Sequence, residues 1–163
     1  MMTILHSACD KTKEPINFGH KFWDFFAQAD ISEMENYFST KIFIPRGSVL
    51  LDKKWGLNPS GDLMTGITID RKNLLNGYNA ILNKIGIQKW KTIFSSVNTD
   101  KITFKKVDTN NHNYYIGAKR NDIIMMVPTG KGDDRLAFVL SLNPENRWNI
   151  NMASIIIAST AYY

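Results

Sequence analysis

The chain of 163 residues has the length of one globular domain, and its 44% apolar and 21% charged residues exclude a disordered or fibrous protein. No stretch reaches the roughly 18 uncharged apolar residues of a membrane helix, so we expect no transmembrane segment. A single cysteine, Cys9, excludes an intramolecular disulfide and the usual thiolate metal sites. The three histidines lie far apart in the sequence, and we expect neither a metal nor a cofactor.

The formal net charge is +5, and the second half of the chain supplies all of it. The excess of basic residues in this half forms either a basic face for an anionic partner or the solvated side of a sheet, where lysines on exposed edges oppose pairing with another chain. The second interpretation is favoured, because the interleaved arginines and aromatic rings of nucleic-acid surfaces are missing. We therefore expect no specific binding of nucleic acid. The residues concerned are Lys84, Lys89, Lys91, Lys101, Lys105, Lys106, Lys119 and Arg120.

The sequence predicts a flexible N-terminal tail over residues 1–17 and a single domain over residues 18–163. Residues 5–9, Leu-His-Ser-Ala-Cys, share features with a bacterial lipoprotein processing site. His6 stands where such sites have a leucine-like residue, and eight residues before Cys9 are few for a signal sequence. Two locations stay open: the cytoplasm, or the periplasm with a lipid anchor if Cys9 is a processed lipoprotein cysteine.

Helical periodicity dominates the first hundred residues. Aromatic side chains recur every three or four residues over 18–29, which predicts an amphipathic helix. A capping box that begins at Ser32 predicts a short second helix ending near Ser39 and Thr40. Residues 42–44 indicate a strand that Pro45 stops, and residues 52–66 a long glycine-rich loop of the kind that is often functional. Asp70 is expected to cap a helix over 70–85 that Gly86 ends, with further helical turns over 87–94.

After residue 100 the apolar period changes from 3.6 to 2. Strands are predicted over 101–105, 114–118, 122–127, 135–142 and 147–157, and the short turns between them indicate an antiparallel meander. The segment Gly130-Lys131-Gly132 lacks the other residues of a phosphate-binding loop, so it is interpreted as a turn between two strands. Helices followed by long antiparallel strands define an α+β fold.

Three segments resemble the nuclear transport factor 2-like, or cystatin-like, superfamily. They are the aromatic run at residues 22–26, the helical region 70–94, and a last hairpin in which Trp148 follows the turn. The resemblance covers roughly residues 18–157. It implies N-terminal helices packed against a strongly curved mixed or antiparallel sheet, the cone, with a pocket between them. It implies no particular function, since the superfamily includes isomerases, dehydratases, cyclases and assembly domains.

A catalytic set is hard to find in the sequence. Catalytic members of that superfamily place an Asp with a His, or an Asp-Arg-Asp cluster, inside the cone. His20 and Asp24 share one face of the first predicted helix, and such a pair could act as a general base. However, the pair falls largely opposite the apolar stripe, so we interpret it as solvated. No catalytic residue is assigned, and the sequence favours a protein that is not an enzyme.

The leading hypothesis is a non-catalytic binding module with a pocket for a small apolar molecule, associated with the cell envelope if Cys9 is processed. Trp55 is expected near the mouth of the pocket, with Tyr37, Tyr78 or Tyr115 deeper inside. Asn151 joins these ligand-binding candidates if its face of the last strand is concave. The alternatives are an isomerase- or dehydratase-like enzyme, or an assembly domain that forms a homodimer through its sheet. A filled interior favours assembly, and an inward carboxylate near a Tyr or His favours the enzyme.

Overall fold

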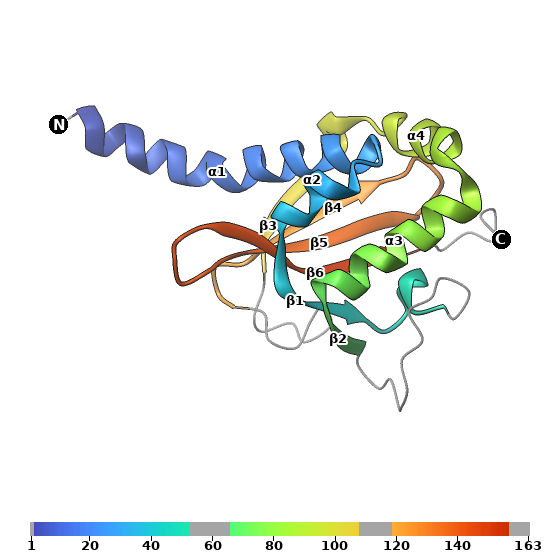
Figure 1. Cartoon of the computed structure of the whole chain (residues 1–163). Coiled ribbons are helices and arrows are strands. Elements are labelled where there is room, and N and C mark those ends of the chain that lie inside the picture. Colours follow the sequence, from blue (N-terminus) through green and yellow to red (C-terminus); the bar gives the residue numbers. More distant parts are fainter. Residues whose placement is uncertain (1, 53–65, 108–118, 157–163) are drawn as a thin grey trace.

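The computed structural model describes residues 2–52, 66–107 and 119–156, with side chains from residue 14 to residue 155 (Figure 1). This part of the chain contains four α-helices and six β-strands. The helices are α1 (Met2–Ala27), α2 (Ile31–Met34), α3 (Arg71–Ile85) and α4 (Ile87–Ser95). The strands are β1 (Phe38–Pro45), β2 (Gly66–Asp70), β3 (Thr103–Lys106), β4 (Ile123–Pro128), β5 (Arg135–Leu142) and β6 (Trp148–Ile156).

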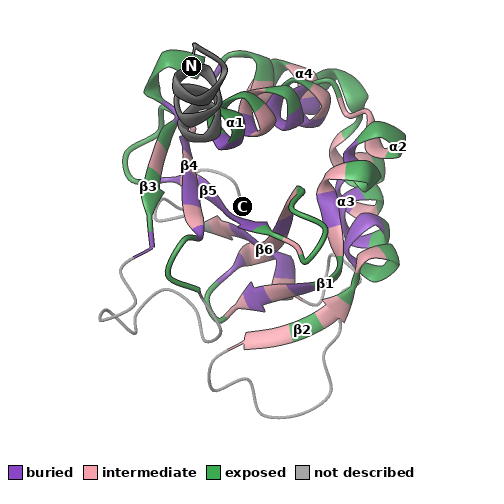
Figure 2. Cartoon of the chain, turned by 90° about the vertical axis from the view of Figure 1, so that its left-hand side faces the viewer, coloured by how far each residue is buried: buried purple, intermediate pink, exposed green. Residues whose placement is uncertain are grey.

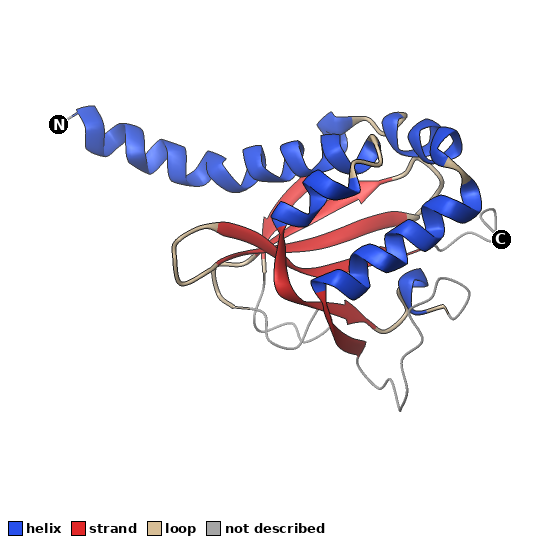
Figure 3. Ribbon diagram, viewed as in Figure 1, coloured by secondary structure: helices blue, strands red, loops and turns tan. Residues whose placement is uncertain are grey.

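The six strands form one mixed sheet in the order β2-β1-β6-β5-β4-β3. Strands β3 to β6 are antiparallel neighbours in chain order, which confirms the predicted meander for the strands that the structure describes. Strand β1 pairs parallel to β6 and antiparallel to β2. The helices lie together on one face of this open sheet (Figure 3), so the predicted α+β class is confirmed. Strong curvature of the sheet stays a prediction.

Alternation along β5 explains how the sheet divides the apolar residues into two clusters. Leu136, Phe138 and Leu140 belong to the large cluster shared with the helices, which we call the helix-facing interior. Ala137 and Val139 belong to a smaller cluster on the opposite face, which we call the outer face. Because successive strand residues point to opposite sides, this pattern fixes which side chains can meet helices. The other outer-face residues are Val107, Ile124 and Met152, with Phe43 and Met126 partly buried.

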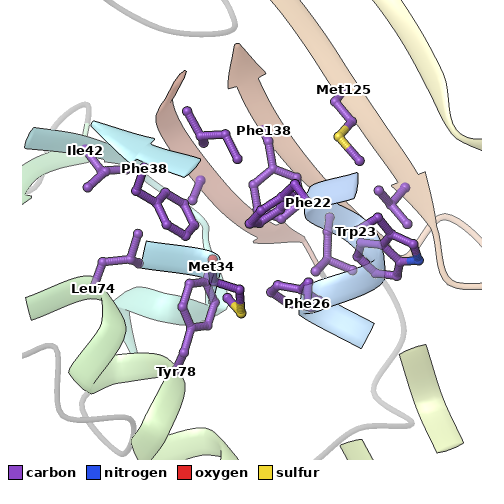
Figure 4. Close-up of a cluster of buried hydrophobic side chains, with 14 of the residues drawn as sticks. Phe22, Trp23, Phe26, Met34, Phe38, Ile42, Leu74, Tyr78, Met125 and Phe138 are labelled. Carbon is purple, nitrogen blue, oxygen red and sulfur yellow. The ribbon is translucent and has the colours of Figure 1, made fainter. Parts of the chain in front are cut away.

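Aromatic side chains from α1 fill the centre of the helix-facing interior. Phe22, Trp23 and Phe26 are buried, and the buried parts of the helices are turned toward the sheet (Figure 2). The Phe22 ring packs edge-on against Phe138 of β5, with ring centroids 4.9 Å apart. Met34, Phe38 and Tyr78 reach the same cluster from α2, β1 and α3 (Figure 4). The amphipathic stripe predicted over residues 18–29 is therefore the central element of the core.

Helix α1 differs from the prediction at its start. It begins at Met2, whereas the sequence predicts a helix from Phe18 after a tail. Pro15 lies inside the helix and is buried, although a proline removes one backbone hydrogen bond and usually marks a helix boundary. Cys9, the residue of the lipoprotein interpretation, lies within this helix. Flexibility of the first seventeen residues stays a prediction.

The second helix is shorter than predicted, because it ends at Met34 and also has its cap at a different residue. Asp30, not Ser32, caps α2, and its carboxylate accepts a hydrogen bond from the Glu33 backbone N–H at 3.2 Å. A 3₁₀ turn over Glu35–Tyr37 follows, and β1 begins at Phe38. Phe38, predicted to be helical, is instead a buried strand residue that pairs with Ile150 of β6. Tertiary burial outweighs local helical periodicity here.

Strand β2 is absent from the sequence prediction. It pairs with β1 through Ile67 and Ile69, and its last residue, Asp70, precedes α3. Asp70 occupies the predicted N-cap position, but its side chain makes no capping hydrogen bond. Its carboxylate forms an exposed ion pair with Lys41 of β1 instead. Five residues with alternating polar positions give a weak strand signal, since such short edge strands depend on their partner.

The basic residues lie partly along an edge of the sheet. Strand β3 is the last strand in the sheet order, and its Lys105 and Lys106 are exposed. Lysines on an edge strand oppose pairing with another chain, which is the interpretation favoured from the sequence.

The close approach of α1 to β3 gives a first test of the packing. A Cβ atom on Gly19 would lie 2.4 Å from Phe104 Cε1 and 3.0 Å from the Met125 sulfur. Gly19→Val should therefore lower the free energy of unfolding by ~2 kcal/mol through overpacking, measured by urea denaturation. Asn17→Val, at an exposed position of the same helix, is the control. Equal stability of the two variants would contradict this helix placement.

Candidate functional site

The structure describes three of the five predicted ligand-binding residues. Tyr78 and Tyr37 contact the helix-facing interior, from α3 and from the 3₁₀ turn before β1. Asn151 lies in β6 and its side chain is on the outer face. The structure thus places Tyr78 and Asn151 on opposite sides of the sheet. Trp55 and Tyr115 lie outside the described residues, as does the predicted strand 114–118.

Tyr78 places a polar atom in the middle of an aromatic cluster. Its ring packs against Phe26 of α1, Phe38 of β1 and Trp90 of α4, with centroids 5.5, 6.2 and 6.4 Å apart. The side chain is fully buried, and its hydroxyl has no hydrogen-bond partner among the described residues. Burial raises the pKa of Tyr78, so the hydroxyl stays protonated near neutral pH. It is therefore a buried donor for which the described residues provide no acceptor.

A second unpaired donor belongs to the same interior. The indole N–H of Trp148, at the start of β6, is buried without a partner in the described part of the chain. Trp148 is partly buried and packs against the helix-facing cluster. Trp90 differs from Trp148 in this respect, because its indole N–H donates a hydrogen bond to the Phe26 carbonyl oxygen at 2.7 Å. The sequence marks Trp148 as an aromatic residue after the turn of the last hairpin, but no sequence signal indicates that its N–H lacks a partner among the described residues.

Tyr37 lies at the border of the interior. Its ring packs against Phe18, Phe22 and Phe25 of α1, with the nearest centroid, that of Phe18, at 4.9 Å. Burial raises the pKa of the Tyr37 hydroxyl, with smaller contributions from the negative charges of Glu33 and Asp24. The residue is half-buried, so unlike Tyr78 it retains a route to solvent.

Acidic and basic side chains do not converge in the described interior. His20 is half-buried beside the Phe104 ring, with centroids 5.4 Å apart, while Asp24 is exposed. No hydrogen bond joins these two residues within the described contacts. The buried carboxylates of the described residues, Asp122 and Asp134, lie just before β4 and just before β5. Within the same ranges, no group of three His, Cys, Asp or Glu residues could hold a metal ion.

Asn151 is half-buried and belongs to a hydrogen-bonded network on the outer face with the buried residues Ser141 and Asp122. Its amide Nδ2 donates to Ser141 Oγ at 2.7 Å, and the Ser141 hydroxyl donates to Asp122 Oδ1 at 2.6 Å. The second carboxylate oxygen, Asp122 Oδ2, accepts from the Lys119 backbone N–H at 2.8 Å. Ser141 shares the outer face with Val139, since the two are separated by one residue on β5. We call these three side chains the Asp122–Ser141–Asn151 network.

No protein-family model, curated protein or solved structure matches this chain. None of the helices in the described ranges combines the length and apolar character that crossing a membrane requires.

Proposed function

We propose that this chain is a non-catalytic binding module that holds a small, mainly apolar molecule between its helices and its sheet. The observation that carries the proposal is the Tyr78 hydroxyl, a fully buried donor with no acceptor among the described residues. An unpaired buried polar group costs roughly 1–3 kcal/mol, and native proteins leave few such groups without a reason. A ligand that offers one acceptor oxygen would remove this cost.

The surroundings of Tyr78 favour a neutral ligand. Its ring neighbours Phe26, Phe38 and Trp90 are apolar on the sides that face it, and a buried ion there would need a partner charge. A carbonyl or ether oxygen accepts a hydrogen bond without carrying charge. Pockets for small molecules combine an apolar lining with a few polar groups that fix orientation. The ligand class is thus an apolar compound with a single neutral acceptor.

Two features support binding over catalysis. General acid–base chemistry needs a titratable pair within hydrogen-bond reach of the substrate, whereas the described helix-facing residues bring no carboxylate or imidazole next to Tyr78. His20 is half-buried whereas Asp24 is exposed, so the two side chains do not form an acid–base pair inside the core. The helix layer over one sheet face, and the closing hairpin with Trp148 after its turn, support the proposed relationship to the nuclear transport factor 2-like superfamily.

The proposal predicts opposite effects of Tyr78→Phe on stability and on binding. Removing the unpaired hydroxyl should raise the free energy of unfolding by about 1 kcal/mol, measured in urea without ligand. The same change should weaken binding of an apolar ketone. A suitable matched pair is 2-acetylnaphthalene and 2-ethylnaphthalene, which differ at one carbonyl. Wild type should bind the ketone ~10-fold more tightly in a calorimetric titration, and Tyr78→Phe should remove this preference.

The control variant is Tyr37→Phe, which removes a hydroxyl from the half-buried border of the interior. It should keep the preference for the ketone. If Tyr78→Phe instead destabilises the protein by more than about 1 kcal/mol, the hydroxyl has a partner in the free protein and the proposal loses its basis. If neither naphthalene binds wild type, a filled interior and an assembly role become the better interpretation.

A further inference from the structure

The outer face carries a buried charge whose described partners are all neutral. Asp122 is 3% exposed, and its carboxylate accepts hydrogen bonds only from the Ser141 hydroxyl and the Lys119 backbone N–H within the described ranges. Buried carboxylates in proteins are usually balanced by a cation or a metal ion. Lys119 and Arg120 are near in the sequence, but both are exposed. The network therefore has an excess of negative charge next to a buried sheet surface.

Asn151 occupies an irregular position in the sheet. On its β5 side, Val139 pairs with Met152 and Leu140 pairs with Ile150, which leaves Asn151 opposite no residue. On its β1 side, the pairing shifts between Phe38 and Phe43, so Asn151 again has no partner in the register. A β-bulge of this kind redirects a side chain and occurs often beside functional sites. The bulge turns the Asn151 amide toward Ser141.

The amide oxygen of Asn151 receives no hydrogen bond from the residues that the structure describes. Asn151 Oδ1 is buried without a partner in the described ranges, while Nδ2 of the same amide donates to Ser141. Turning the amide over would not resolve this, because the single Ser141 hydrogen is already donated to Asp122. The site therefore offers an acceptor atom that is two hydrogen bonds away from a buried negative charge.

We propose that the Asp122–Ser141–Asn151 network binds the primary ammonium group of a small organic cation. An N–H of the ammonium donates to Asn151 Oδ1, and the Asp122 charge stabilises the cation through the short chain of hydrogen bonds. A charge-assisted hydrogen bond is about twice as strong as a neutral one, which favours the ammonium over an alcohol. This site is across the sheet from Tyr78 and does not depend on the function proposed above.

A bare metal ion fits the same residues less well. Metal ions such as Ca²⁺ need several oxygen atoms directed at one point. Here the Asn151 nitrogen, not its oxygen, faces Ser141, so the amide and carboxylate oxygens are directed to different places. An ammonium needs only one strong acceptor and a favourable field, and this arrangement provides both.

The test is an NMR titration of the full chain that follows the Asn151 side-chain amide. Three probes separate charge from donor capacity: n-butylammonium has both, tetramethylammonium has charge without an N–H, and 1-butanol has a donor without charge. We expect n-butylammonium to shift the Asn151 signal saturably and to bind at least ~10-fold more tightly than either control. No saturable shift with n-butylammonium, or equal shifts with all three probes, would overturn the proposal. Calcium chloride forms a fourth arm, and an equal shift with it would identify a metal site instead.

Two variants check the roles of the residues. Asn151→Leu removes the acceptor, so n-butylammonium should no longer shift the Ser141 backbone amide signal, which is the readout used for both variants. Asp122→Asn keeps the shape of the side chain and should weaken n-butylammonium binding ~10-fold. The backbone spectrum of each variant shows whether it is folded, and the comparison of probes on wild type does not depend on either variant. Unchanged affinity in folded Asp122→Asn would contradict the electrostatic part of the proposal.

Discussion

Replacement of Phe22 by alanine is expected to lower the free energy of unfolding by about 3–5 kcal/mol, the range for a buried aromatic residue in a core. Phe22 is 0% exposed and its ring contacts the rings of Phe26, Phe38 and Phe138, which belong to α1, β1 and β5. Truncation would leave a cavity at the point where the first helix meets two strands. Urea denaturation followed by far-UV circular dichroism measures the change.

The matched control is Asp24→Ala, two residues along the same helix. Asp24 is exposed, so its replacement should change the stability by no more than about 0.5 kcal/mol. A loss below about 1 kcal/mol for Phe22→Ala would mean that the ring is not in the core, and the packing of α1 on the sheet would then be wrong.

The parts of the fold that were predicted from the sequence are those with a strong period. The strand 135–142 was predicted with the bounds of β5, because its apolar residues cover both faces and short turns flank it. The helix before Gly86 is predicted from one continuous apolar stripe and from the glycine itself, and Gly86 ends α3 with a positive φ of 86°. In both cases the local signal and the tertiary environment favour the same structure.

The prediction failed where tertiary contacts decide. Strand β2 has only Ile67 and Ile69 as apolar residues, and it becomes a strand by pairing with β1. Phe38 repeats at helical spacing from Met34, but the structure places it opposite Ile150 in the sheet. None of these partners can be identified from neighbouring residues alone.

In the candidate sites, too, the sequence predicts the residues, whereas their contacts depend on the tertiary structure. The sequence predicts Tyr78 as a ligand contact because it combines an aromatic ring with a polar group, and the structure shows that it is fully buried. Its hydroxyl has no partner among the described residues, and this depends on which side chains surround it, which no sequence pattern encodes. The sequence predicts Asn151 as a ligand contact only if its face of the last strand is concave. Its link to Ser141 and Asp122 depends on the strand order and on a bulge, both of which arise only in the assembled sheet.

Trp90 connects the helices around Tyr78, and its indole N–H has a structural role. The donor satisfies the Phe26 carbonyl near the end of α1, where helix carbonyls lack their usual partners. The same carbonyl also accepts from the Ala29 backbone N–H at 3.0 Å. Loss of the indole hydrogen bond alone would therefore leave the Phe26 carbonyl oxygen with one donor, the Ala29 backbone N–H. The ring itself, buried against Phe26 and Phe94 with centroids 5.1 and 5.0 Å away, contributes the larger part of the stabilisation.

Two replacements of Trp90 should separate these contributions. Trp90→Phe keeps most of the ring and removes the N–H, so it should cost about 1–2 kcal/mol of unfolding free energy. Trp90→Ala also removes the packing of α4 on α1, and it should cost about 3–5 kcal/mol. Both values come from urea denaturation under identical conditions. Equal losses for the two variants would mean that the hydrogen bond to Phe26, rather than the ring, holds α4 in place.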